Sequence, residues 1–242
     1  MIMSVRTADF RRPDALDHPP DIPAETIRTG PTRASLRGVM SLPHSPTLER
    51  AAEAVAGWLR ARPAPSHGPK ILAIDGRSGA GKSGFADLLA PLLGPAPEVT
   101  VVRLDDIYPG WDGLAATPLL VTTWVLRPLS AGRPGRFRRW DWVRDRPGGW
   151  TPVPAAPIVL LEGAGAGAAP CRPYLTGLVW LDLPAGERKK RALARDGEGY
   201  RPHWDRWAAQ EEALLTVDPV PEHADLRVEV STGAVLAWRS SR

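Results

Sequence analysis

The sequence contains very little cysteine and very little lysine. Cys171 is the only cysteine in 242 residues, which excludes an intramolecular disulfide, a cysteine-based zinc site and an iron–sulfur cluster. The only lysines are Lys70, Lys82, Lys189 and Lys190, whereas the arginines number 27. Such an arginine excess is typical of a GC-rich genome, so an arginine in this chain needs support from its neighbours before it is assigned a function.

Long apolar runs and a strong charge imbalance are also missing. No run approaches the roughly 20 apolar residues of a membrane-spanning helix, and residues 1–12 lack the apolar segment of a secretory signal. The formal net charge is only +4, and the most basic stretch, residues 133–146, is interrupted by Asp141 and Asp145. These features argue against a membrane partner and against a nucleic-acid partner, and the single cysteine fits the cytoplasmic location that we expect. The oligomeric state is left open.

Proline, arginine, aspartate and threonine are frequent in residues 1–43, which show no sustained apolar period. This composition predicts a flexible N-terminal extension. Residues 44–242 are then expected to form one domain. Its first helix follows Ser45, which can cap it, and stops at Pro63.

Strand and helix patterns alternate through the rest of the chain. Short apolar runs predict strands at 70–75, 99–104, 157–161, 178–183 and 226–230, and helical patterns lie at 82–93, 118–129, 185–195 and 203–215. The basic, aromatic stretch 133–150 fits either a hairpin or a loop. The alternation predicts a three-layer α/β fold, with a five-stranded, mainly parallel sheet flanked by helices.

A complete phosphate-loop motif, G-x-x-x-x-G-K-[ST], joins the first of these strands to a helix. Its residues are Gly76, Arg77, Ser78, Gly79, Ala80, Gly81, Lys82 and Ser83. Its backbone N–H groups can face phosphates, Lys82 adds a positive charge, and Ser83 offers a hydroxyl to Mg²⁺. The motif predicts a nucleoside triphosphate site and a P-loop NTPase fold. The sequence has no [NT]-K-x-D and no L-S-G-G-Q motif, which argues against a small GTPase and a transporter ATPase.

Two acidic sites follow predicted strands and are expected near this loop. Glu162 comes directly after a buried apolar strand, where it could bind Mg²⁺ directly or through water. Asp105 and Asp106 end the strand at 99–104, and an aspartate there suits a general base that takes the proton of an attacking hydroxyl. A capping or turn role is the simpler alternative for both sites.

Taken in order, these segments resemble the uridine kinase and phosphoribulokinase-like P-loop kinases. The matching patterns are D-G-x-S-G-x-G-K-S from Asp75, D-D-x-Y at 105–108 and an apolar residue followed by E-G at 161–163. W-D-W at 140–142 is similar to the family's Y-D-F segment, and residues 188–196 are similar to its arginine-rich helix. The resemblance covers roughly residues 70–230.

The resemblance implies a kinase that uses ATP and Mg²⁺, with a small lid at about residues 196–203. It implies that Asp105 is the base and that Ser83 and Glu162 serve Mg²⁺. It further implies that three arginines contact phosphates when the lid closes, namely Arg188, Arg191 and Arg195. Tyr108, Trp140 and Asp141 are implied at the substrate site, and the expected acceptor is a hydroxyl of a nucleoside or a similar metabolite.

The sequence leaves the acceptor and two other functions open. The family's base-contacting histidine is replaced by the stretch 143–146, and Trp111, Trp140 and Trp142 could either stack on a flat acceptor or pack the core. A regulatory P-loop ATPase without a small acceptor is the main alternative. A nucleic-acid-binding module that uses the arginines and tryptophans of 133–150 is the least favoured alternative, and it would show a steep salt dependence.

Overall fold

A computed structural model describes residues 46–237, and the extension expected at 1–43 lies outside the described residues. Six strands form the main sheet: β1 (Lys70–Asp75), β2 (Val99–Arg103), β5 (Ile158–Glu162), β6 (Gly177–Asp182), β7 (Leu226–Glu229) and β8 (Ala234–Ala237). Two more strands, β3 (Gly135–Asp141) and β4 (Arg146–Val153), form a separate hairpin. The longer helices are α1 (Pro46–Ala61), α2 (Lys82–Leu93), α5 (Ala185–Asp196) and α6 (Trp204–Val217). A further helical stretch consists of α3 (Thr117–Val121), a π-helical turn (Thr122–Leu126) and α4 (Arg127–Ser130).

The strand order of the main sheet is β2-β5-β1-β6-β7-β8, and all neighbours run parallel except β7 and β8. Strand β1 is central, and the chain leaves it first toward β2 and β5 and later toward β6 on its other side. A strand where the connection changes direction marks the crevice in which open α/β sheets bind ligands. The register places Glu162 beside both Ile74 of β1 and Arg103 of β2, at the carboxyl ends of the three strands.

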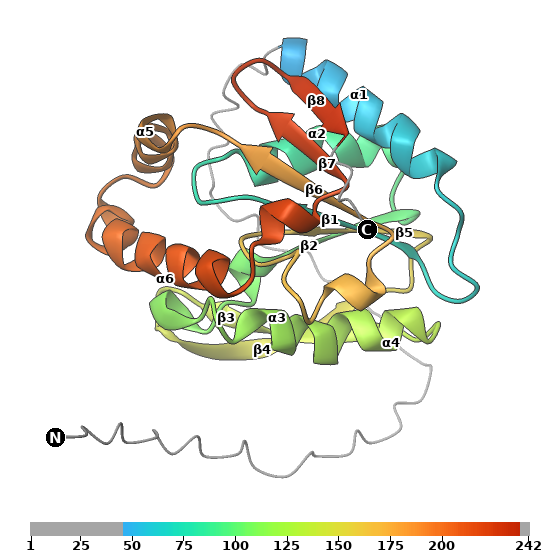
Figure 1. Cartoon of the computed structure of the whole chain (residues 1–242). Coiled ribbons are helices and arrows are strands. Elements are labelled where there is room, and N and C mark those ends of the chain that lie inside the picture. Colours follow the sequence, from blue (N-terminus) through green and yellow to red (C-terminus); the bar gives the residue numbers. More distant parts are fainter. Residues whose placement is uncertain (1–45, 238–242) are drawn as a thin grey trace, which may run out of the picture. The chain divides into compact units, whose positions relative to one another are not determined.

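Side chains of the central strands alternate between two apolar cores. Leu72 and Ile74 of β1 belong to one core, whereas Ile71 and Ala73 belong to the other. This period of two follows from the pleat of a strand that is buried on both faces. Helices α1 and α2 cover the first face, and the α3–α4 stretch and α6 cover the second (Figure 1).

The first described helix is joined to the central strand by a lysine. Apolar residues of α1, such as Val55 and Leu59, are fully buried on its sheet-facing side. At the helix end, the Lys70 ammonium donates hydrogen bonds to the carbonyl oxygens of Leu59 (3.1 Å), Arg60 (3.0 Å) and Arg62 (2.5 Å). These bonds satisfy carbonyls that a helix C-terminus leaves without partners, and the cation complements the helix dipole.

The predicted elements agree closely with the observed ones, and one strand was not predicted. Strand β8 pairs antiparallel with β7 and extends the predicted five-stranded sheet to six strands. The stretch 133–150, predicted as a hairpin or a loop, forms most of the β3–β4 hairpin, whose register shifts between Arg138 and Trp140. No helix in residues 46–237 is long and apolar enough to cross a membrane.

Candidate active site

The phosphate loop connects the end of β1 to the start of α2, as its sequence predicts. Gly79 and Gly81 have φ values of +82° and +96°, in the left-handed region that favours glycine. A Cβ at Gly79 would overlap the carbonyl oxygen of Arg188, so α5 lies directly against the loop. The first N–H groups of α2 have no partners within the helix, which makes this end an anion-binding position.

The side chain of Lys82 turns back toward the first residues of the phosphate loop. Its ammonium donates hydrogen bonds to the carbonyl oxygens of Gly76 (2.8 Å) and Arg77 (3.3 Å). An ammonium at this position is available for the terminal phosphates of a bound nucleotide once these bonds are exchanged.

Ser83 and Glu162 come together at the carboxyl end of the sheet. The Ser83 hydroxyl donates to Glu162 Oε1 at 3.0 Å, and Arg103 Nη1 donates to the same oxygen at 3.0 Å. Glu162 is only 2% exposed. Its burial raises the pKa of this carboxyl, the nearby charge of Asp105 raises it further, and Lys82 and Arg103 oppose the rise.

The oxygen atoms of Ser83 and Glu162 fit Mg²⁺. Mg²⁺ in nucleotide sites takes one or two protein oxygens and completes its shell with phosphates and water. Within residues 46–237 no group of three or more His, Cys, Asp or Glu side chains could hold a metal alone, so a phosphate-bound Mg²⁺ is the kind that suits this pair. Arg103 is also tied to Asp87 of α2 at 2.6 Å, which keeps its guanidinium beside Glu162.

The two adjacent aspartates after β2 differ in their surroundings. Asp105 is exposed and lies two residues beyond Arg103, the residue of β2 that pairs with Glu162 of β5. Asp106 instead accepts a hydrogen bond from Arg139 Nε at 3.1 Å. Of the two acids, Asp105 therefore has the surroundings that an accessible base requires.

Asp75, which precedes the loop, is buried and joins it to the segment after Glu162. Its carboxylate accepts hydrogen bonds from the N–H groups of Gly76 (2.6 Å), Gly165 (3.1 Å) and Gly167 (2.8 Å). Burial raises the pKa of Asp75 to about 6, although these hydrogen bonds and the charge of Lys82 oppose the rise. The carboxylate thus connects the two segments that carry the phosphate loop and Glu162.

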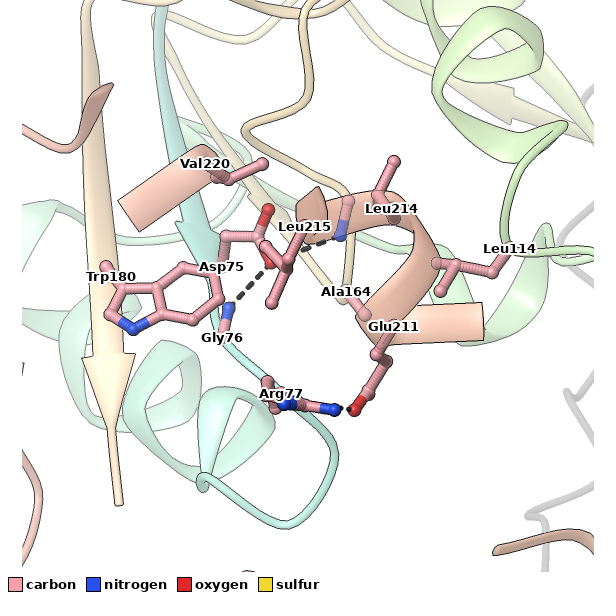
Figure 2. A pocket seen from close by; sticks show the side chains of 11 residues that line it. Asp75, Gly76, Arg77, Leu114, Ala164, Trp180, Glu211, Leu214, Leu215 and Val220 are labelled. Atoms are coloured by element: carbon pink, nitrogen blue, oxygen red, sulfur yellow. Dashed lines mark hydrogen bonds and ion pairs between the residues drawn. The ribbon is translucent and has the colours of Figure 1, made fainter. Parts of the chain in front are cut away.

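A cavity of about 10 Å³ lies behind the loop, against Asp75, Gly76 and Trp180 (Figure 2). Figure 2 also shows the Arg77 side chain directed toward Glu211 of α6. A volume of this size holds at most a single water molecule. The cavity is therefore a small gap in the packing next to Asp75 and has no room for a substrate.

The three arginines predicted to contact phosphates have different environments. Arg188 is buried, and its guanidinium donates to the carbonyl oxygens of Leu183 (3.1 Å) and Ser78 (3.2 Å). Arg191 is exposed. Arg195 is paired with Asp196, which raises its pKa, and Asp105 adds a smaller electrostatic contribution. Arg195 is thus exposed and held by its neighbour Asp196, whereas Arg188 contacts the backbone of the loop.

The residues predicted at the substrate site are not all accessible. Tyr108 is 2% exposed and donates its hydroxyl to the carbonyl oxygen of Ala164 at 2.9 Å, a core position that does not fit direct contact with an acceptor. Asp141 accepts hydrogen bonds from the backbone and side chain of Arg144, which lower its pKa and close the hairpin turn. Trp140 lies against Gly110. Trp142 is more exposed and donates its indole N–H to the carbonyl oxygen of Asp105 at 2.8 Å.

Aromatic rings lie next to this contact. Trp111 stacks on His203 at a centroid distance of 4.1 Å and on Tyr200 at 5.4 Å, and Trp142 lies 4.9 Å away at a tilted angle. His203 and Tyr200 belong to the region of the predicted lid at 196–203, which consists mainly of two short 3₁₀ turns. The ring of Trp111 thus connects that region to the hairpin beside Asp105.

Three residues of the site were not predicted from the sequence. Asp75 connects the phosphate loop to the segment after Glu162, Arg103 contacts Glu162, and Glu211 of α6 accepts from the N–H of Ser78 in the loop. Asp75 is the first residue of the D-G-x-S-G-x-G-K-S pattern, so the sequence did indicate its closeness to the phosphate loop. Arg103 and Glu211 carried none, because only the packing of distant segments decides which arginine and which glutamate reach the site.

No protein-family model and no curated protein match this chain. A candidate uridine kinase from Bacillus stearothermophilus matches in structure with 21% identity and a TM-score of 0.49, over 68% of this chain and 94% of that chain. A candidate fructose transport system kinase from Silicibacter sp. TM1040 matches with 14% identity and a TM-score of 0.48, over 75% and 91%. The YGR205w protein matches with 12% identity and a TM-score of 0.48, over 79% and 95%.

These similarities concern the backbone, and two of the three proteins are named as kinases. The strands and the loop of this chain assign the fold by themselves. A buried parallel strand that ends in G-x-x-x-x-G-K-[ST] and continues into a helix is the P-loop arrangement. The chain has a P-loop α/β fold, and the predicted fold class is confirmed.

Proposed function

We propose that this protein is an ATP-dependent kinase that transfers the γ-phosphate to a hydroxyl of a nucleoside or a similar small metabolite. The observation that carries the proposal is the exposed Asp105, which follows the end of β2 where Arg103 pairs with Glu162 of β5, at the carboxyl end of the sheet. A phosphate loop alone serves many classes of protein. An accessible carboxylate beside it is what transfer to an alcohol additionally requires.

The loop and Lys82 would bind the phosphates of ATP. The N–H groups at the start of α2 and the Lys82 ammonium supply positive potential where the terminal phosphates would lie. Ser83 and Glu162 would hold the Mg²⁺ that accompanies ATP. When bound, this ion neutralises charge on the β- and γ-phosphates.

Asp105 would act as the general base. As the acceptor oxygen forms its bond to the γ-phosphorus, the carboxylate takes the hydroxyl proton, the bond from the γ-phosphorus to the bridging oxygen breaks, and ADP leaves. Arg195 and Arg191 would add positive charge near the transferred group when the segment 196–203 closes over it. For Arg188, its contact with the carbonyl of Ser78 supports a role in holding the loop.

The surroundings of Asp105 support a flat acceptor such as a nucleoside. Trp142 is partly exposed, and its indole N–H is bonded to the backbone of Asp105 itself. Its ring lies within 4.9 Å of Trp111, so two large aromatic surfaces meet next to the base. Aromatic faces of this kind stack favourably on planar heterocycles.

The decisive experiment compares two neighbouring aspartates. The wild-type protein is incubated with Mg·ATP and a panel of nucleosides, vitamins and sugars, and acceptor-dependent ADP release is followed. Asp105→Asn should lower transfer about 10²- to 10⁴-fold, which is the usual contribution of a general base, with little change in ADP affinity. Asp106→Asn is the matched control, because that carboxylate is engaged by Arg139 and is expected to affect transfer much less.

Equal transfer by wild type and Asp105→Asn would remove Asp105 from the mechanism. ADP release by the wild type that no acceptor accelerates would favour the alternative of a regulatory P-loop ATPase.

A further inference from the structure

Two consecutive peptide groups of the phosphate loop are bonded to buried charged side chains. The N–H of Ser78 donates to Glu211 Oε1 at 2.7 Å, and the carbonyl oxygen of Ser78 accepts from Arg188 Nη1 at 3.2 Å. Glu211 is 2% exposed and Arg188 is 7% exposed. They belong to α6 and α5, the helices on either side of the segment 196–203.

In a trans peptide the N–H and the C=O point in opposite directions, so each of these bonds sets the direction of a second group. The bond to Glu211 orients the peptide whose carbonyl belongs to Arg77. That carbonyl accepts from the N–H of Ala80 at 3.1 Å and from the Lys82 ammonium at 3.3 Å. The bond to Arg188 likewise orients the N–H of Gly79.

The position of Glu211 is electrostatically costly for an anion-binding loop. A buried carboxylate must be compensated by hydrogen bonds and an opposite charge, and a negative charge near bound phosphates opposes their binding. Compensation is present, because Glu211 also accepts from Trp207 Nε1 at 3.1 Å and is paired with Arg77 Nε at 3.3 Å. A role in shaping the loop accounts for an acid in this place.

The backbone of the phosphate loop has conformational freedom that a bond to Glu211 would restrict. Gly79, which follows Ser78, has a positive φ and lacks the side chain that would limit its backbone. Without the bond to Glu211, the peptide between Arg77 and Ser78 could rotate and change the direction of the carbonyl that faces Lys82.

We propose that Glu211 is a positioning residue for nucleotide binding, which through the N–H of Ser78 fixes the phosphate loop in its binding conformation. It acts together with Arg188, so the docking of α5 and α6 sets the affinity of the loop for the phosphates of ADP and ATP. This inference rests on the proposed function, because it requires that the loop binds nucleotide.

The test measures the affinity for ADP in the presence of Mg²⁺ by isothermal titration calorimetry, together with thermal stability. Glu211→Ala removes the acceptor and should weaken ADP binding about tenfold, the effect of losing one buried hydrogen bond. Glu211→Gln keeps an oxygen that can accept from Ser78 and should restore most of the affinity. A role in stability alone would not produce this recovery.

Glu212→Ala is the matched control, because Glu212 is the neighbouring acid and pairs with the same Arg77 at 2.8 Å but is 66% exposed. It should change ADP affinity less than about twofold. Wild-type affinity in Glu211→Ala, or an equal loss in Glu212→Ala, would overturn the proposal while leaving the kinase intact. If the wild type itself binds no ADP, the proposed kinase function is wrong, and the role of Glu211 is wrong with it.

Discussion

The two sides of the candidate active site differ in how their charged groups are held. The phosphate side surrounds the phosphate loop, and its buried charged residues are each bonded to a neighbouring segment: Asp75, Glu162, Arg188 and Glu211. On the acceptor side, Asp105 is exposed. The groups around the phosphate loop are thus fixed by the fold, whereas the proposed acceptor side is open to solvent.

This difference has an energetic reason. Buried charges lose their hydration, so each of them requires partners that fix its position. Exposed pairs are screened by water and salt and restrict their partners little. Changes to buried charges on the phosphate side should therefore alter stability strongly, whereas changes to exposed ion pairs on the acceptor side should alter it little.

On the phosphate side, the largest expected effect is that of Lys82→Ala. The variant removes a charge that would stabilise the transferred phosphate, so transfer should fall about 10²- to 10³-fold, as when one such group is removed from other enzymes. Acceptor-dependent ADP release measures this loss of transfer, and Lys190→Ala on the exposed surface of α5 is the control. Unchanged transfer in Lys82→Ala would show that the phosphate side does not work as the fold suggests.

An intermediate effect concerns Asp75 and pH. Because the pKa of Asp75 in the folded protein is about 6, against an ordinary value of 3.8, the folded chain keeps this proton at pH values where the unfolded chain has lost it. The stabilising contribution of the protonated form is complete below about pH 4 and is lost as pH rises through 6. This difference corresponds to about 3 kcal/mol.

Urea unfolding of wild type and Asp75→Asn between about pH 4 and pH 7 tests this contribution. The stability of the wild type relative to the variant should decline across this interval. Parallel curves for the two proteins would mean that Asp75 is hydrated and that burial does not shift its pKa.

The smallest expected effect belongs to the acceptor side. Asp112 and Arg206 form an exposed ion pair, with Arg206 Nε donating to Asp112 at 2.6 Å. Asp112→Asn should lower the free energy of unfolding only slightly, and less at high salt. A large shift of the urea unfolding midpoint that salt does not reduce would contradict the contrast between the two sides.

Much of the fold could be predicted because apolar runs and turn residues report local structure. Strands β1, β2, β5, β6 and β7 each show as a short apolar run, and the phosphate loop has its own motif. Strand β8 was missed because its four residues form a strand by pairing with β7, which the local sequence does not encode.

The site could be predicted only in part. Glu211 and Glu212 are adjacent acids on one helix, and only the docking of α6 on the loop buries the first and exposes the second. Arg188, Arg191 and Arg195 recur at helical spacing, which suggested one common role. The contact of Arg188 with Ser78 separates it from the others.

The scarcity of lysine has a consequence for labelling the protein. Lys70 and Lys82 have their ammonium groups bonded to backbone carbonyls, whereas Lys189 and Lys190 are exposed on α5. Among the lysine side chains, an amine-reactive dye should therefore react first at these two neighbours. A fluorescent dye can therefore be attached to α5, the helix that leads into the segment 196–203, without an engineered attachment site.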